Sequence, residues 1–411
     1  IAGNLILNVN ILILLISAAF FYRAEFFKIK IYFLDKVILV FFLYALLLGL
    51  ISTYNNYLEN SSQNFFIIFK TLAYLRFLIL YFLIRYLIEN NLFNFKLFFI
   101  SSSLCSVFVC LDLIYQYMFG VDIFGYKPII SRRMSGPFGD ELIAGSYLQR
   151  FFLFTFFMFP LFFRFKEKKI YLLIFTLLFF LLSFSLIISG NRMPTLLFLL
   201  IATLIFLLEK EIRKIGIPFL FIFSIIFTAA YNFNPNMKTH YNSFSEEIIW
   251  LVNSAVKNKF DARAVKKDDK FVEHYKEWYI GVETWKQNKI FGGGIKSFKI
   301  NCPKWGTMKK IANCGSHPHN YYLEILSDLG LVGLTLLSII FVNIFYKSFI
   351  KKYFTNSNLR SFHLITPFMF LFIAEIFPIK TSGSFFSTSN ATFIFLVMAI
   401  TVALINRQKL N

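Results

Sequence analysis

Long apolar runs recur along the chain and are separated by short polar or basic stretches. Most of these runs approach about 20 residues, the length that an α-helix needs to cross the hydrocarbon core of a bilayer. The pattern predicts an all-α fold, a polytopic bundle of about eleven membrane helices. They are expected near 4–22, 35–53, 65–88, 95–118, 143–163, 169–189, 193–208, 215–231, 319–346, 361–378 and 385–405.

One polar and charged segment, 232–318, interrupts this pattern. A connection of that length is expected to be functional rather than a simple turn. It is predicted to contain short amphipathic helices over about 243–258 and 273–289, of the kind that lies on a membrane surface or covers a cavity. The chain is thus divided into helices 1–8 (1–231), the long loop, and helices 9–11 (319–411), which together form one functional domain.

Basic residues gather in alternate connections, and this asymmetry predicts a topology. The connections at 22–36, 164–169, 209–214 and 347–360 each carry several Lys or Arg, whereas the one at 54–64 carries none. By the positive-inside rule the basic connections are cytoplasmic, and the long loop then faces outward. The first residue would also lie outside, and a helix lost from the N-terminus would give twelve in the full chain.

The composition agrees with a membrane protein, since 57% of the residues are hydrophobic and 20% are aromatic. The formal net charge of +20 does not indicate a nucleic-acid partner, because much of it lies at helix ends. Membrane lipids are the expected surroundings. The sequence contains no P-loop, zinc-peptidase helix, nucleophile elbow or clear divalent-metal cluster. We therefore expect neither a metal nor another cofactor, and a substrate that is already activated.

The clearest candidate chemistry lies where the long loop meets the ninth helix. If a helix begins near His319, then this residue, Gly330 and Gly333 share one face. That face would have an imidazole at its outer mouth and two glycines where another helix could approach closely. A histidine held there can accept a proton near neutral pH. An incidental histidine at a helix end is the alternative interpretation.

Two carboxylates, Glu324 and Asp328, lie four residues apart in the same apolar run. Carboxylates in a membrane helix are costly unless they have partners or protons. A like-charge pair at this spacing indicates that at least one is protonated or paired with Lys or Arg. The pair weakens the incidental interpretation of His319, and it would also suit a proton-coupled transporter.

Basic residues on the predicted outer face are candidates for binding an anion. Arg192 lies at a predicted helix start, where free N–H groups, the helix dipole and a guanidinium converge, and a snorkelling interfacial arginine is the alternative. Arg132 and Arg133 either form a polar mouth or are neutralised by two acids nearby. The remaining candidates are His274, which is solvated in the simpler interpretation, and Lys380, which would add positive potential.

Two cysteines, Cys302 and Cys314, lie in the long loop close to a pair of histidines. In an oxidising compartment two nearby cysteines favour a disulfide, which is the expected state. Free thiols are an alternative. A zinc site with His317 and His319 is another, although the spacing is not a standard one for zinc.

Several of these features together resemble the O-antigen ligase and polymerase superfamily of bacterial envelope glycosyltransferases. His319-Asn320, nine residues and then Gly330-x-x-Gly333 is similar to the motif of the ligases. Gly190-Asn191-Arg192 is similar to the arginine turn of the family. Trp285 to Gly294 is similar to the segment before the glycine-rich element of its periplasmic loop, and one large outer loop before the third-last helix is similar to its architecture.

The resemblance implies a metal-independent transfer of a glycan from undecaprenyl diphosphate to a sugar hydroxyl of lipid A–core, at the periplasmic face of the bacterial inner membrane. It implies that His319 is the base and that Arg192 binds the diphosphate. The family often has an arginine four residues before a tryptophan of the loop, and here that position is a histidine. Substrate-binding roles would fall to Arg132, Arg133, His274, Trp278, Asn320 and Lys380.

Alternative functions stay open beside the preferred one, O-antigen ligase. An O-antigen polymerase or a protein O-oligosaccharyltransferase of the same superfamily differs in its acceptor, which the motifs do not report. A proton-coupled transporter or flippase is a different class. It would need a gate on the inner side and internal repeats, and no repeat is visible in the sequence.

Overall fold

The structure is a computed structural model, and in the residues that it describes the regular structure is helical apart from one antiparallel bridge between Ile130 and Arg133. Each of the eleven predicted membrane helices corresponds to a helix of the structure, which confirms the all-α class. The described residues are 3–22, 29–58, 65–130, 133–163, 168–233, 235, 238–239, 241–243, 245–246, 249, 273–304, 314–355, 364–381 and 383–410.

Six helices in these ranges are long and apolar enough to cross a membrane by length and composition. Four more apolar helices are shorter, among them the segment Ile365–Glu375, which ends earlier than the sequence pattern predicted. The predicted amphipathic helix over 243–258 lies mostly outside the described residues. The second amphipathic helix is present as α10 (Glu273–Gln287).

The chain divides into two compact units, which are described separately. The first contains Asn94–Asn258 and Phe362–Ala374. Its core is built from phenylalanine rings that meet edge to face, such as those of Phe99 and Phe154 with centroids 5.1 Å apart. Its helices are α4 (Phe95–Phe119), α5 (Ala144–Phe162), α6 (Lys168–Ile188), α7 (Arg192–Leu208), α8 (Lys210–Phe233) and most of α14 (Ile365–Glu375).

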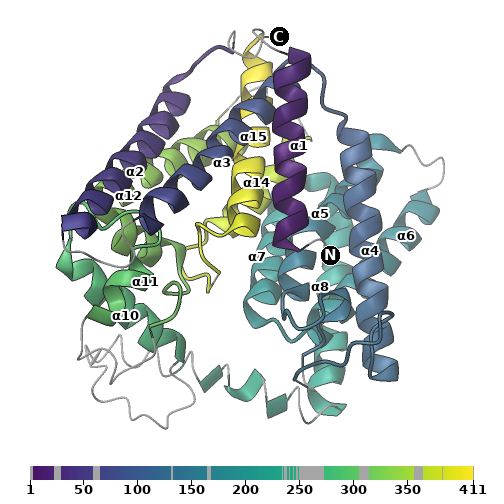
Figure 1. The fold of residues 1–411 in the computed structure, drawn as a ribbon. Helices are drawn as coiled ribbons and strands as arrows, with labels where there is room; N and C mark the ends of the chain where they lie inside the picture. Colours follow the sequence, from purple (N-terminus) through teal and green to yellow (C-terminus); the bar gives the residue numbers. More distant parts are fainter. Residues whose placement is uncertain are drawn as a thin grey trace. The chain divides into compact units, whose positions relative to one another are not determined.

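The second unit contains Ala2–Phe93, Lys259–Ser361 and Glu375–Asn411. In it α2 packs against α3 and α12, and α10 packs against α12 (Figure 1). The rings of Tyr74, Phe77 and Phe395 join α3 to α15. Its helices are α1 (Asn4–Tyr22), α2 (Phe33–Leu58), α3 (Phe66–Glu89), α10, α11 (Phe298–Asn301), α12 (Tyr321–Phe345), α13 (Lys351–Phe354) and α15 (Thr388–Leu410).

A buried cluster of charges ties α2, α3 and α15 together. The guanidinium of Arg85 is fully buried and pairs with Asp35 on α2 and, at 2.9 Å, with Glu89 one turn further along α3. The hydroxyl of Tyr81 donates to Asp35 at 2.8 Å, and Asn406 on α15 donates to Glu89 at 3.0 Å. A buried charge is tolerated only with such partners, so this cluster fixes how the three helices meet.

We predict that Asp35→Ala destabilises the protein strongly. The substitution leaves the buried guanidinium of Arg85 without its partner on α2, and such a loss costs about 3–5 kcal/mol. Denaturant titration in detergent micelles measures the change in the free energy of unfolding. Lys36→Ala alters the neighbouring residue, whose side chain is exposed, and serves as the control. Equal stability of the two variants would contradict the prediction.

Candidate functional site

The start of α12 is set by Asn320, which acts as its N-cap. The side-chain oxygen of Asn320 accepts hydrogen bonds from the backbone N–H of Tyr322 at 3.0 Å and of Leu323 at 3.2 Å. Its amide nitrogen donates to the carbonyl of Pro378 at 2.8 Å. The helix therefore begins at Tyr321, and the sequence-based start near His319 was two residues too early.

His319 lies just before the helix in a left-handed backbone conformation, with φ of 51°. A residue with a Cβ adopts this conformation only when its surroundings impose it, and such strain is common at functional sites. The surroundings here are the Asn320 cap on one side and Pro318 on the other. Pro318 is held under α10, where a Cβ on Gly281 would lie 2.9 Å from the proline ring.

The imidazole of His319 faces one acidic and one basic neighbour. Its Nε2 lies 3.4 Å from Oε1 of Glu277 on α10, and the two side chains are 37% and 30% exposed. The ring of His317 lies 4.2 Å from that of His319, centroid to centroid. Pro318, which stands between them in the chain, does not keep the two rings apart. The bend at this turn therefore brings the two rings together.

The predicted continuous face from His319 to Gly333 is interrupted, because α12 breaks at Gly330. This glycine has φ of 65° and ψ of −167°. The backbone that approaches it belongs to the loop after α10, not to another helix. A Cβ on Gly330 would lie 2.3 Å from the carbonyl oxygen of Ile290, and one on Gly292 would lie 2.4 Å from that of Asp328. Only residues without a Cβ allow this contact.

Hydrogen bonds hold the loop in the break. The N–H of Leu331 donates to the carbonyl of Lys289 at 2.9 Å, and the N–H of Gly294 donates to that of Asp328 at 2.7 Å. The hydroxyl of Tyr44 on α2 reaches the carbonyls of Phe291 and Leu329, at 2.8 and 3.0 Å. The break thus satisfies its backbone groups with the loop, and the loop is fixed to α12.

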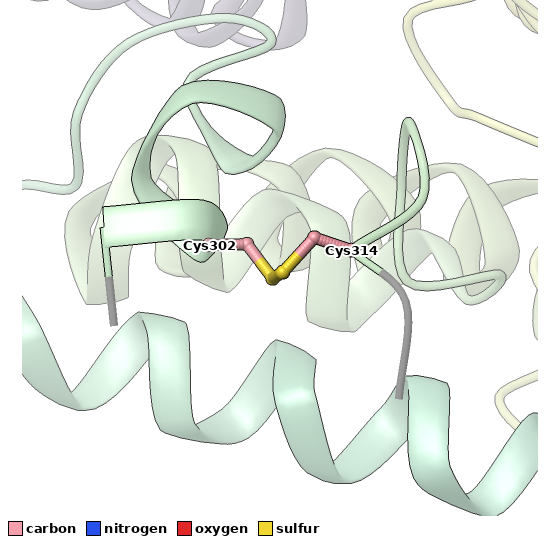
Figure 2. The surroundings of a disulfide bond; sticks show 2 residues. All are labelled: Cys302 and Cys314. Atoms are coloured by element: carbon pink, nitrogen blue, oxygen red, sulfur yellow. A yellow bond between two sulfur atoms is a disulfide. The ribbon is translucent and has the colours of Figure 1, made fainter. Parts of the chain in front are cut away.

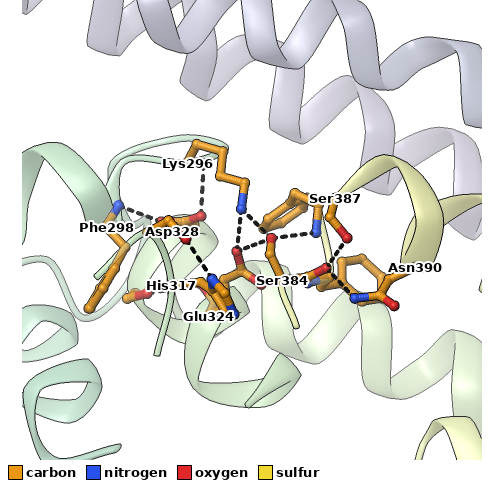
Figure 3. A network of polar contacts seen from close by, with 12 residues as sticks. Lys296, Phe298, His317, Glu324, Asp328, Ser384, Ser387 and Asn390 are labelled. Carbon is orange, nitrogen blue, oxygen red and sulfur yellow. Dashed lines mark hydrogen bonds and ion pairs between the residues drawn. The ribbon is translucent and has the colours of Figure 1, made fainter. Parts of the chain in front are cut away.

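Glu324 is engaged in a buried polar network (Figure 3). Lys296 donates to its carboxylate at 3.0 Å and Ser384 at 2.5 Å, and the backbone N–H of Phe385 donates at 2.6 Å. We predicted that at least one of the two carboxylates is protonated or paired with Lys or Arg, and Glu324 is paired with Lys296. Lys296 itself could not be found from the sequence, because it lies 28 residues before Glu324.

Asp328 holds the loop through its backbone (Figure 3). Its carboxylate accepts hydrogen bonds from the N–H groups of Lys296 at 2.8 Å and Phe298 at 2.7 Å, and from the hydroxyl of Ser297 at 3.2 Å. It therefore caps the start of α11. Glu324 and Asp328 thus both hold other segments of the second unit against α12 through their hydrogen bonds.

Lys380 is buried beside Glu375. Its ammonium lies 2.9 Å from that carboxylate and 5.6 Å from the centroid of the Tyr321 ring, whose hydroxyl donates to Glu375 at 2.8 Å. Asn320 donates to backbone carbonyls of the same turn. In this arrangement the charge of Lys380 is neutralised by Glu375, so a role in binding substrate stays a prediction.

A disulfide joins Cys302, at the end of α11, to Cys314, with their Cα atoms 5.9 Å apart (Figure 2). It packs against Phe298 and against Ile280 of α10, so it supports the helix that carries Glu277 and Trp278. His274 lies on the same helix, and its side chain is outside what the structure describes. Among the described residues, no three His, Cys, Asp or Glu side chains gather as they would around a metal.

Arg192 belongs to the first unit and opens α7, as predicted, with Asn191 as N-cap residue. The turn before it is packed tightly on α5, since a Cβ on Gly145 would lie 2.6 Å from Cβ of Asn191. Burial raises the pKa of Tyr241 to about 12, and the positive charge of Arg192 acts against this rise. The guanidinium is therefore within electrostatic reach of the Tyr241 hydroxyl.

Arg133 lies in the same unit, on a loop anchored to α4. The side-chain oxygen of Gln116 accepts the N–H groups of Ser135 and Gly136, each at 2.9 Å. The N–H of Met134 donates to the carbonyl of Ile188, next to the turn that precedes Arg192. The structure thus brings the Arg133 segment to the Arg192 turn. Arg132 lies outside the described residues.

The predicted site residues therefore fall into two groups. His319, Asn320, Trp278 and Lys380 lie in the second unit, where Glu277 was missed because it lies 42 residues before His319 in another helix. Arg192 and Arg133 lie in the first unit.

Apolar helices long enough to span a membrane, joined to a polar segment that carries a strained histidine beside a carboxylate, define a polytopic membrane protein with a candidate acid–base site. Residues 177–338 match the protein family described as O-antigen ligase. This region includes Arg192, the long loop and the His319-Asn320 motif. This match supports the resemblance to the O-antigen ligase and polymerase superfamily. No curated protein matches the chain.

We predict that Cys302 and Cys314 are joined in the protein as isolated from its membrane. Alkylation of the denatured, unreduced chain followed by mass spectrometry should leave both unmodified. Cys105 and Cys110 are free in the structure and should be alkylated, which makes them internal controls. Alkylation of all four cysteines, or stoichiometric zinc, would contradict the prediction.

Proposed function

We propose that this protein is an O-antigen ligase, which transfers a glycan from undecaprenyl diphosphate to a sugar hydroxyl of lipid A–core. The observation that carries the proposal is the strained His319, held at the N-terminus of α12 within the region that matches the family. Its imidazole is more than a third exposed and so is accessible to a substrate. Members of the superfamily act on lipid-linked glycans, which fits a membrane bundle with a polar site.

The chemistry needs no nucleotide, because the anomeric carbon of a diphosphate-linked sugar is already activated. His319 takes the proton of the acceptor hydroxyl, whose oxygen then forms the new bond to the anomeric carbon. The bond to the diphosphate oxygen breaks, and the leaving group carries its electrons away. Arg192, at the start of α7, neutralises the departing diphosphate through bidentate hydrogen bonds.

The periplasmic face of the inner membrane is the proposed location. The positive-inside pattern favours an outward-facing long loop, and a disulfide in that loop fits an oxidising compartment. The Cys302–Cys314 bond supports α10, so the oxidised state is part of the proposed site. Trp278 and Trp285 on α10 would contact sugar rings through their indole faces.

The carboxylate pair of α12 no longer favours a proton-coupled transporter. Glu324 and Asp328 were candidates for moving protons, and both are held by several donors that tie segments together. A polymerase or protein O-oligosaccharyltransferase would use the same donor and the same base. The acceptor separates these from a ligase: only a ligase restores capped lipopolysaccharide in a strain that lacks its own.

We predict that Arg192→Lys lowers transfer about tenfold or more, since a hydrogen bond to a charged group contributes about 1.5–3 kcal/mol and lysine cannot form the bidentate pair. The assay uses purified chain in lipid with a lipid-linked donor. Arg213→Lys is the control, because that guanidinium donates to a carbonyl of its own unit at 3.1 Å. Wild-type activity in Arg192→Ala would remove Arg192 from the mechanism.

We predict that His319→Ala lowers the rate of transfer about a hundredfold to ten-thousandfold, the usual contribution of a general base. His319→Asn should lower the rate by the same factor. Asparagine tolerates the left-handed conformation, so this variant removes the base while keeping the backbone conformation. Insertion and donor binding should persist in both variants. The reconstituted assay measures the rates, and filter binding of labelled donor measures the retained affinity.

His317→Ala provides the comparison within the same turn. Its ring contacts that of His319, so we expect a smaller loss than in His319→Ala. Transfer by His319→Asn at the wild-type rate would show that His319 is not the base. A larger loss in His317→Ala would move that role to His317.

A further inference from the structure

Two close contacts determine where α10 lies against the turn before α12. Gly281 sits against Pro318, and Ile280 is buried against the disulfide. Glu277 comes one helical turn before Gly281 and therefore projects from the same face. The residue that follows Pro318 is His319, so the packing of α10 puts a carboxylate beside the imidazole.

The pair of Glu277 and His319 is poorly placed to stabilise the fold. Both side chains are about a third exposed, and ion pairs of that kind contribute about 0–1 kcal/mol. The next acid on α10, Glu283, bonds Lys286 on its own helix at 2.5 Å. Glu277 instead faces a strained residue of another segment at 3.4 Å, a distance that a small movement would shorten to a hydrogen bond.

We propose that Glu277 is a positioning residue that selects the tautomer of His319. The inference rests on the proposed function of His319 as base. A carboxylate only accepts hydrogen bonds, so the neutral imidazole must present Nε2–H to Glu277. The lone pair on Nδ1 is then directed to the acceptor hydroxyl, and the neighbouring ring of His317 limits rotation of the imidazole.

In the proposed reaction each proton and electron pair has a defined destination. The hydroxyl proton passes to Nδ1 of His319, the oxygen pair forms the glycosidic bond, and the electrons of the old bond leave with the diphosphate. The imidazolium that forms is stabilised by the carboxylate of Glu277, in the way that an acidic partner holds the histidine of a catalytic triad. The imidazolium then releases its proton to water, to which both side chains are exposed.

The first test needs no turnover. The chain contains five histidines, so ¹⁵N-histidine labelling in lipid bilayers gives few signals, and His319→Asn and His317→Asn assign the two of interest. Above the pH at which imidazole titrates, His319 should show a protonated Nε2 and a bare Nδ1. Glu277→Ala should give a mixture of tautomers, whereas Glu283→Ala, on the same helix, should change nothing. An unchanged tautomer in Glu277→Ala would overturn the inference.

The second test measures kinetics of the purified chain with lipid-linked donor. Glu277→Ala should lower kcat about tenfold with little change in the KM for acceptor, because the loss concerns the base and not binding. Glu277→Asp should recover part of the loss. In the His319→Asn background Glu277→Ala should have no further effect, since it acts through that imidazole.

The two tests separate failure of the inference from failure of the proposed function. Normal kcat in Glu277→Ala, in a chain that does transfer glycan, overturns the inference and leaves the function standing. A wild-type chain that transfers no glycan from any lipid-linked donor overturns the proposed function, and with it the part of Glu277 in the reaction. A tautomer change together with a kcat loss supports both.

Discussion

The packing of one backbone segment into the break of α12 is the constraint on which the candidate site depends. Gly330 and Gly292 face each other so closely that a Cβ on either would collide with main-chain atoms of the other segment. Asp328 accepts the N–H groups of Lys296 and Phe298 at the same place. The loop after α10 therefore has a single position on α12, and a helix break with a positive φ is stable because the loop satisfies it.

The packing of the loop in the break of α12 also determines where His319 lies. The anchored loop fixes the end of α10, the disulfide fixes the middle through Ile280, and Gly281 lets the helix descend onto Pro318. From the other side Asn320 caps α12 and holds the turn against the carbonyl of Pro378. A histidine in a left-handed conformation is strained, and such strain persists only where contacts hold the residues on both sides of it in place. Such preorganisation is what a base needs to meet a hydroxyl in one orientation.

Local features of the fold could be predicted from the sequence, and contacts between distant segments could not. The membrane helices depend on the length of each apolar run, and the start of α7 at Arg192 depends on the turn and proline beside it. Gly330 was read as a helical position because a glycine in an apolar run carries no local sign of positive φ. Glu277 and Lys296 were missed because their partners lie 42 and 28 residues away, and only the folded chain pairs them.

The three carboxylates near α12 show how burial divides structural from chemical roles. Glu324 and Asp328 are 1% and 0% exposed, and their oxygens accept hydrogen bonds from backbone N–H groups, two serines and a lysine. A buried carboxylate that accepts this many hydrogen bonds would lose several of them if it moved or took up a proton. Its role is therefore structural. Glu277 is 30% exposed and lies 3.4 Å from Nε2 of His319, whose side chain is 37% exposed. In the proposed reaction a substrate arriving from solvent would meet this carboxylate and the imidazole, because both are partly exposed. A proton can move there without breaking the hydrogen bonds that anchor the loop to α12.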